Sequence, residues 1–170
     1  PGSSTTLGPH GTARYPAKNA DGDWGFIDEA GVWVVEPRYK WVASFSEDLA
    51  AVLDDLYGFI DRDGAVAIPL EFAGVGSFSA GLAPVFLASQ NGNRWGYIDP
   101  SGAVVLEPRF NDAKPFSEGM ALVRVDAAWG YIDTTGELII EPRFEQASSF
   151  AEGLAAVWLD SEQLESAGAG

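Results

Sequence analysis

The sequence predicts an all-β protein: a tandem repeat of four three-stranded antiparallel units. First, one pentapeptide pattern recurs four times, at steps of 33, 38 and 34 residues. Second, each copy ends in Asp and is followed three residues later by Gly, a pairing that favours tight turns. Third, no segment carries a sustained apolar period of 3.6 residues, whereas short segments alternate with a period of two, which is typical of strands.

The repeat is dense enough to define the unit. The pentapeptide reads Trp or Tyr, Gly, an aromatic, Ile and Asp. Aromatic residues recur fifteen and twenty-one positions after its start, an Ala at twenty-six and a Val at twenty-eight. Such agreement in four copies predicts a repeat architecture with a structural role for the shared positions. These structural positions are Trp24, Gly25, Asp28, Gly31, Tyr57, Gly58, Asp61, Gly64, Trp95, Gly96, Asp99, Gly102, Trp129, Gly130, Asp133 and Gly136.

This pattern resembles the WG-repeat family, also called KWG repeats, over about residues 24–157. The third and fourth units match best, and the second departs, with Tyr57 for Trp and Ile68-Pro69-Leu70 for Glu-Pro-Arg. The resemblance implies a bacterial repeat array of unsettled molecular role, often fused to other domains. It implies no enzyme activity.

The elements of one unit follow in order from the third copy. Residues 95–99 alternate as a first strand, and Asp99-Pro-Ser-Gly102 carries the residues of a type I turn. The β-branched run 103–106 predicts a second strand that ends before Pro108. Residues 119–124 predict a third strand, entered through a Gly that the first unit replaces with Asp48, a residue that tolerates left-handed geometry. A single helical turn is the alternative for residues 110–116.

The two ends of the repeat decide between two architectures. Residues 11–15 resemble a degenerate third strand, and residues 153–159 form a spare one. We predict a repeat domain over 11–159, stacked as an open, twisted, solenoid-like array. A closed four-bladed, propeller-like ring is the alternative. Residues 1–10 are expected to be a flexible arm that starts with a vector-derived Pro1-Gly2-Ser3, and residues 160–170 a linker-like tail.

Composition excludes several classes of function. The chain has 25 acidic and 10 basic residues, for a formal charge of −15, which disfavours nucleic acid and anionic membrane surfaces. No apolar run approaches the length of a membrane span. Without Cys, thiolate catalysis, disulfides and Cys-ligated zinc are excluded. The compartment stays open.

The four turn aspartates invite a calcium hypothesis. Calcium needs six to eight oxygens around one point. These carboxylates occur once per unit, and each has a turn to cap, so the turn interpretation is preferred and no metal or cofactor is expected.

The three Glu-Pro-Arg segments place opposite charges two residues apart. We expect them to form a surface ladder of ion pairs between stacked units that sets the register. Paired catalytic acids, as in glycoside hydrolases, are the alternative, but a neighbouring Arg favours the charged form of each Glu. His10 lies outside the repeat, so a Ser-His-Asp site is disfavoured. No catalytic residue is predicted.

Aromatic residues outside the pattern are the binding candidates. Trp41 stands where the other units have Gly74, Asp112 and Gln146, so it predicts a contact surface, or a cap packed on the N-terminal arm. Phe86 and Leu87, placed in an inserted loop, form a second candidate patch. Trp158, a further binding candidate, is expected to cover the open end, whereas Trp33 is expected to be buried.

These observations favour a non-catalytic scaffold that binds another protein or a fused neighbouring domain, with the acidic surface steering a basic partner. A carbohydrate or cell-wall binding module that uses exposed aromatics is the alternative.

Overall fold

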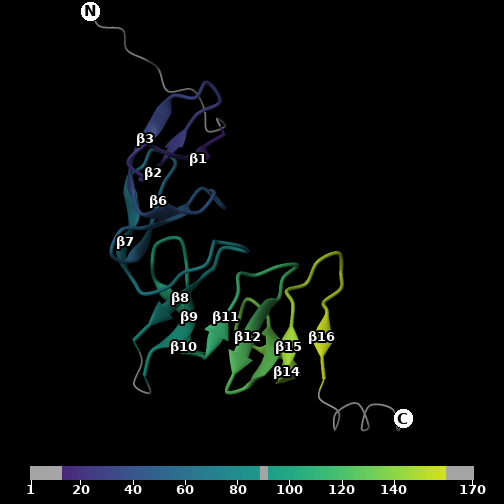
Figure 1. The fold of residues 1–170 in the computed structure, drawn as a ribbon. Helices are drawn as coiled ribbons and strands as arrows, with labels where there is room; N and C mark the ends of the chain where they lie inside the picture. Colours follow the sequence, from purple (N-terminus) through teal and green to yellow (C-terminus); the bar gives the residue numbers. More distant parts are fainter. Residues whose placement is uncertain (1–12, 89–91, 160–170) are drawn as a thin grey trace, which may run out of the picture.

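A computed structural model describes residues 13–88 and 92–159, and every regular element in these ranges is a β-strand (Figure 1). The described residues contain no helix that could cross a membrane. The predicted arm, residues 1–10, and tail, residues 160–170, lie outside them. The strands are β1 (Tyr15–Lys18), β2 (Trp24–Ile27), β3 (Trp33–Tyr39), β4 (Trp41–Val42), β5 (Ala50–Leu53), β6 (Tyr57–Ile60), β7 (Val66–Phe72), β8 (Ala83–Leu87), β9 (Arg94–Ile98), β10 (Val104–Phe110), β11 (Asp112–Ala113), β12 (Ala121–Val125), β13 (Ala128–Ile132), β14 (Leu138–Phe144), β15 (Gln146–Ala147) and β16 (Val157–Trp158).

These strands form four antiparallel sheets and, at the C-terminal end, a two-stranded hairpin. Sheet 1 has the order β1-β2-β3, sheet 2 β4-β5-β6-β7, sheet 3 β8-β9-β10 and sheet 4 β11-β12-β13-β14; β15-β16 is the terminal hairpin. Each sheet combines the last strand of one sequence repeat with the Trp-Gly strand of the next. The helical turn considered for residues 110–116 is wrong, because this connection contains β11 instead.

The Gly of each Trp-Gly pair allows a neighbouring strand to bulge over it. In sheet 1, Trp24 pairs with Tyr39 but Phe26 pairs with Val35, so two residues of β2 span four of β3. The Glu-Pro-Arg segment occupies this bulge. A Cβ atom on Gly58 would lie 2.7 Å from a carbonyl oxygen of β7, and one on Gly130 2.6 Å from that of Ile140. Only Gly permits such an approach.

Tight turns follow the Trp-Gly strands. In the last of them, the Asp133 carboxylate accepts hydrogen bonds from the N–H groups of Thr135 and Glu137, at 2.9 and 3.0 Å. Gly136 then adopts a φ of 85°, which L-residues with a side chain avoid. Asp48, with a φ of 68°, adopts the left-handed geometry predicted for it.

The core lies between successive sheets, and the inner sheets bury both faces. Neighbouring residues of β6 show this: Ile60 packs into the core cluster between sheets 1 and 2, and Phe59 into the cluster between sheets 2 and 3. Both are fully buried. A third cluster lies between sheets 3 and 4, and a fourth between sheet 4 and the terminal hairpin. A unit therefore completes its core only with its neighbours, as expected of a repeat stack.

Side chains also link neighbouring sheets through backbone groups. Between sheets 2 and 3, the Ser46 hydroxyl donates to the carbonyl of Phe78 at 2.7 Å, and the Glu47 carboxylate accepts from the N–H of Gly81 at 2.9 Å. Ser117 and Glu118 repeat this link to the terminal hairpin. At the junction of sheets 3 and 4, Ala80 stands at the Glu position and cannot make the link.

The expected ladder of Glu–Arg ion pairs is wrong. None of the four ion pairs in the described residues involves a Glu-Pro-Arg segment. Instead, Arg38 donates to the carbonyl of Gly64, and Arg109 to that of Gly136, in the turn of the following sheet. The register is thus supported by arginine–backbone hydrogen bonds, because the bulge directs Arg toward the next turn.

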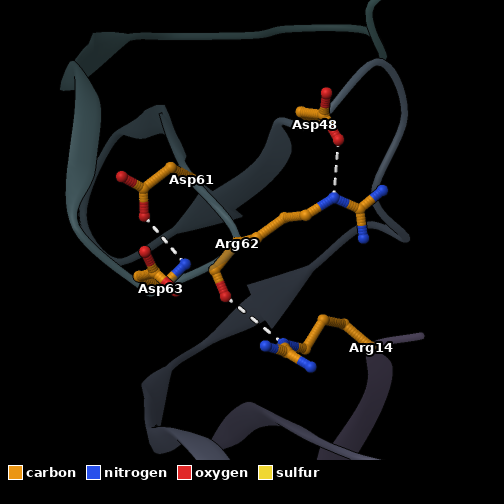
Figure 2. Close-up of polar contacts among 5 residues, drawn as sticks. All are labelled: Arg14, Asp48, Asp61, Arg62 and Asp63. Carbon is orange, nitrogen blue, oxygen red and sulfur yellow. Dashed lines mark hydrogen bonds and ion pairs between the residues drawn. The ribbon is translucent and has the colours of Figure 1, made fainter. Parts of the chain in front are cut away.

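Arg62 adds a link between sheets 1 and 2 (Figure 2). Its Nε donates to an Asp48 oxygen at 2.6 Å, while its backbone carbonyl accepts from Arg14 at 3.3 Å. Its guanidinium also lies over the Phe45 ring, 5.3 Å from the centroid. Arg62 is therefore linked toward sheet 1 only through its backbone carbonyl, while its side chain contacts Asp48 and Phe45 in the β4–β5 connection of its own sheet.

The stack is open, as predicted. Sheet 1 and the terminal hairpin lie at opposite ends of a curved array, so β16 does not pair with the first sheet (Figure 1). A strand does precede the first Trp-Gly strand, but the predicted bounds, residues 11–15, are wrong: it is β1 at residues 15–18, because the pairing with β2 starts at Tyr15, opposite Ile27. The closed four-bladed ring does not form.

Candidate binding surface

The first aromatic of each Trp-Gly pair lies on the flank of the stack rather than fully inside it. Trp24, Tyr57, Trp95 and Trp129 are all half-buried, whereas the aromatics two residues later are fully buried. Each packs beside a residue of the strand before it: Lys18 lies 5.6 Å from the Trp24 ring, and Arg124 5.8 Å from that of Trp129. The flank thus presents one covered aromatic per sheet.

Trp41 makes this flank different in sheet 2. It pairs with Leu53, which pairs in turn with Tyr57, so the three side chains share one face of three adjacent strands. Trp41 meets the Tyr57 ring edge-on, with centroids 6.0 Å apart, and remains 43% exposed. We call Trp41, Leu53 and Tyr57 the Trp41 patch. The alternative packing of Trp41 on residues 1–10 falls outside the described residues.

Charged residues adjoin the Trp41 patch in the sequence: Lys40 precedes Trp41, and Asp54 and Asp55 follow Leu53. Lys40 lies 2.6 Å from an Asp55 oxygen and 3.6 Å from one of Asp54. The hydrogen bond and charge of Lys40 lower the pKa of Asp55, and Asp55 raises the pKa of Lys40. All three groups are exposed, so the pair contributes little to folding. These three neighbouring residues carry two carboxylates for one ammonium, an acidic balance.

Phe86 and Leu87 lie in strand β8, so their predicted place in an inserted loop is wrong. Phe86 pairs with Trp95, at 5.5 Å between ring centroids, and Leu87 packs on the cluster between sheets 2 and 3. Both are half-buried. The insertion starts later than the sequence comparison suggested, because β8 continues to its pairing with Arg94.

The two remaining tryptophans lie at opposite ends. Trp158 is 53% exposed on β16, at the open end where it was expected. Trp33 is half-buried, not buried as predicted. Its counterparts Val66 and Val104 are 53% and 44% exposed, so this position lies at the margin of each sheet rather than in its core.

The turn carboxylates are engaged by their own backbone. Asp99 accepts from the Ser101 hydroxyl at 2.6 Å and from the N–H groups of Ser101 and Ala103. The Ser101 hydroxyl is the main cause of the lowered pKa of Asp99, and Thr135 acts likewise on Asp133. In residues 13–88 and 92–159, no three His, Asp or Glu side chains gather as a potential metal site. The carboxylates serve as turn caps.

A family model described as WG containing repeat matches residues 24–55, 57–87, 95–127 and 129–160. The chain belongs to the WG-repeat family. No curated protein and no solved structure matches it. The four matched segments start at the Trp-Gly positions, which links the family signature to the bulge described above.

The sequence pointed to Trp41 but not to the rest of its patch. Leu53 precedes Tyr57 by four residues, and its counterparts are Phe86, Arg124 and Trp158. This variability is the signal that could have identified it, because residues that pair with a flank aromatic are free to vary. WG-repeat units thus share a core and differ along this flank.

Proposed function

We propose that this WG-repeat chain is a non-catalytic scaffold that binds a basic segment of another protein, or of a neighbouring domain, at the Trp41 patch. The observation that carries the proposal is the 43% exposure of Trp41 beside Leu53 and Tyr57. Exposed Trp beside Tyr is typical of interface hot spots.

The placement of Trp41 within the repeat supports a binding role. Its position holds Gly74 in sheet 3, Asp112 in sheet 4 and Gln146 in the terminal hairpin, so stacking does not require an aromatic there. The other flank aromatics are covered by their neighbours. Because the fold does not require Trp at this position, an exposed Trp there supports contact with a partner.

Charge suggests the chemistry of the partner. The chain carries a formal charge of −15, and Asp54 and Asp55 directly follow Leu53 of the patch in the sequence. A partner segment that combines Lys or Arg with an apolar side chain would match both features, with the charges mainly increasing the association rate. The non-catalytic character is supported by the turn carboxylates, whose lone pairs are engaged by backbone N–H groups.

A peptide-binding comparison tests this function. The full chain is incubated with immobilised peptides that combine Lys or Arg with aromatic or aliphatic residues, and in parallel with insoluble polysaccharides and peptidoglycan. Trp41→Gln introduces the residue that the terminal hairpin carries at the equivalent position, Gln146, and should therefore preserve the fold. Val66→Gln, at a similarly exposed apolar residue of the same sheet, is the matched control.

We expect selective retention on basic–apolar peptides. Trp41→Gln should weaken it by ~2 kcal/mol, roughly 30-fold, whereas Val66→Gln should have no effect. Retention should also fall as salt rises from about 0.05 to about 0.5 M. Retention on glycans alone, insensitive to salt, would instead establish the carbohydrate interpretation. Equal retention of both variants would refute a role for the patch.

A further inference from the structure

In the described residues, the two ends of the stack lack contacts that the inner sheets make with their neighbours. The Ile of each internal Trp-Gly strand fills a core cluster with the preceding sheet: Ile60 the first, Ile98 the second and Ile132 the third. The fourth cluster, between sheet 4 and the terminal hairpin, contains no such Ile. Ile27 of sheet 1 is half-buried and belongs to none of the four.

Among residues 13–88 and 92–159, no strand lies beside β16 to supply that Ile. Elsewhere, the strand equivalent to β16 pairs with a Trp-Gly strand, and the buried Val of each faces its Gly: Val52 with Gly58, Val85 with Gly96 and Val123 with Gly130. In the described residues, β16 pairs only with β15. Val157 is consequently 40% exposed, whereas its three counterparts are fully buried.

The unpaired edge of β16 has free hydrogen-bonding groups at Val157. The carbonyl of Trp158 accepts from the N–H of Glu145, and that of Ala156 from the N–H of Ser148. Backbone groups of successive strand residues point to opposite edges. The N–H and C=O of Val157 therefore point away from β15. Such an edge is a template for another strand.

Strand β1 is a poor occupant of the corresponding place beside β2. It pairs Ala17 with Gly25 and Tyr15 with Ile27, so Ala17 stands where the other units have Val, and Tyr15 where they have Ala. Tyr15 is 48% exposed. Strand β16, with Ala155 and Val157 at these positions, matches the repeat better.

We propose that the chain associates head to tail: β16 of one copy pairs with β2 of a second copy, replaces its β1, and receives Ile27 into the fourth core cluster. The occupant is a second copy because the contact continues the interface already formed between the sheets. Val157 would face Gly25, and Trp158 would face Trp24. The contact is heterologous, so repetition extends a chain of molecules.

Sedimentation velocity tests the proposal through proline substitutions at equivalent strand positions. Val157→Pro removes the donor at the free edge of β16 and leaves the bonds to β15 intact. Ala17→Pro weakens β1 and frees the edge of β2. We expect the average mass of the unmodified chain to rise from about 10 μM to about 1 mM, Ala17→Pro to shift this rise to roughly tenfold lower concentration, and Val157→Pro to abolish it.

Mixing two variants gives the decisive result. Ile27→Gln blocks the N-terminal end and Val157→Pro the C-terminal end, so each alone should remain monomeric. An equimolar mixture has one intact pair of ends and should stop at a dimer of about twice the monomer mass. Val66→Gln, the control, should associate like the unmodified chain. A monomeric Ala17→Pro variant at every concentration, or single variants that associate as strongly as the unmodified chain, would overturn the proposal.

Discussion

The inner sheets and the two ends of the stack carry the same repeat residues but differ in what covers them. Ile60, Ile98 and Ile132 are fully buried, whereas Ile27 at the first sheet is half-buried. At the other end Leu154 is 76% exposed, although its counterpart Leu82 is 6% exposed. The difference teaches that the burial of a repeat residue is decided by its neighbouring unit. The repeat residues are therefore suited to a position between two neighbouring units.

Substituting the paired leucines should show the largest contrast. Leu82→Ala removes a buried side chain from the third core cluster and should lower the free energy of unfolding by about 2–5 kcal/mol. Leu154→Ala removes a mainly exposed one and should change it by less than about 0.5 kcal/mol. Urea denaturation followed by tryptophan fluorescence measures both. Equal losses would break the comparison.

At alkaline pH, the two buried tyrosines, Tyr97 and Tyr131, should contribute differently to the free energy of unfolding. Burial, with a contribution from the charge of Asp112, raises the pKa of Tyr97, and burial raises that of Tyr131. The unfolded chain ionises first, so this stability is present below about pH 10 and is lost as pH rises toward the folded-state value. Between pH 10 and 11, the free energy of unfolding of Tyr97→Phe should therefore fall by about 1 kcal/mol less than that of the unmodified chain.

Tyr131→Phe is the matched variant for this experiment. Tyr131 lies in the fourth cluster, which lacks its Ile, so its pH dependence should be weaker than that of Tyr97. Both substitutions suit the fold, because sheets 1 and 2 carry Phe26 and Phe59 at this position. Identical pH profiles for the two variants would show that the outer cluster is as closed as the inner one.

The smallest expected change in the free energy of unfolding concerns the Glu–Gly hydrogen bond that Ala80 cannot make between sheets 3 and 4. Ala80→Glu should restore the hydrogen bond to the backbone N–H of Gly119 that Glu47 makes to Gly81 and Glu118 to Gly153. It should raise the free energy of unfolding by about 0.5 kcal/mol, the low end for an exposed hydrogen bond. Ala80→Gln, which keeps the shape without the charge, is the control. A loss of stability would contradict the link.

Much of the fold could be predicted because the repeat consists of turns and strands with clear local sequence preferences. The Asp and Gly of each turn, and Asp48 in left-handed geometry, follow from local backbone preferences that act within four residues. The family and the open stack were also correctly anticipated. The turn geometry needs no knowledge of the neighbouring sheet.

The errors concern contacts between strands. Adjacent residues Ala50, Ala51 and Val52 are all buried, since sheet 2 packs on both faces, and such a run hides which face each side chain takes. The Glu-Pro-Arg ladder failed because the bulge over Gly could not be derived from spacing. Trp41 could be singled out as a candidate because it breaks the repeat, whereas Leu53 joins its patch only through strand pairing.

Replacing each pentapeptide Ile with Val tests most directly whether sheets share their cores with their neighbours. The substitution removes one methylene group at four repeat-equivalent sites and preserves strand propensity. We predict that Ile60→Val, Ile98→Val and Ile132→Val each lower the free energy of unfolding by about 1 kcal/mol, and that Ile27→Val, measured on the monomer, changes it by less than about 0.3 kcal/mol. Four equal losses would contradict the account, because Ile27 would then be as enclosed as the others.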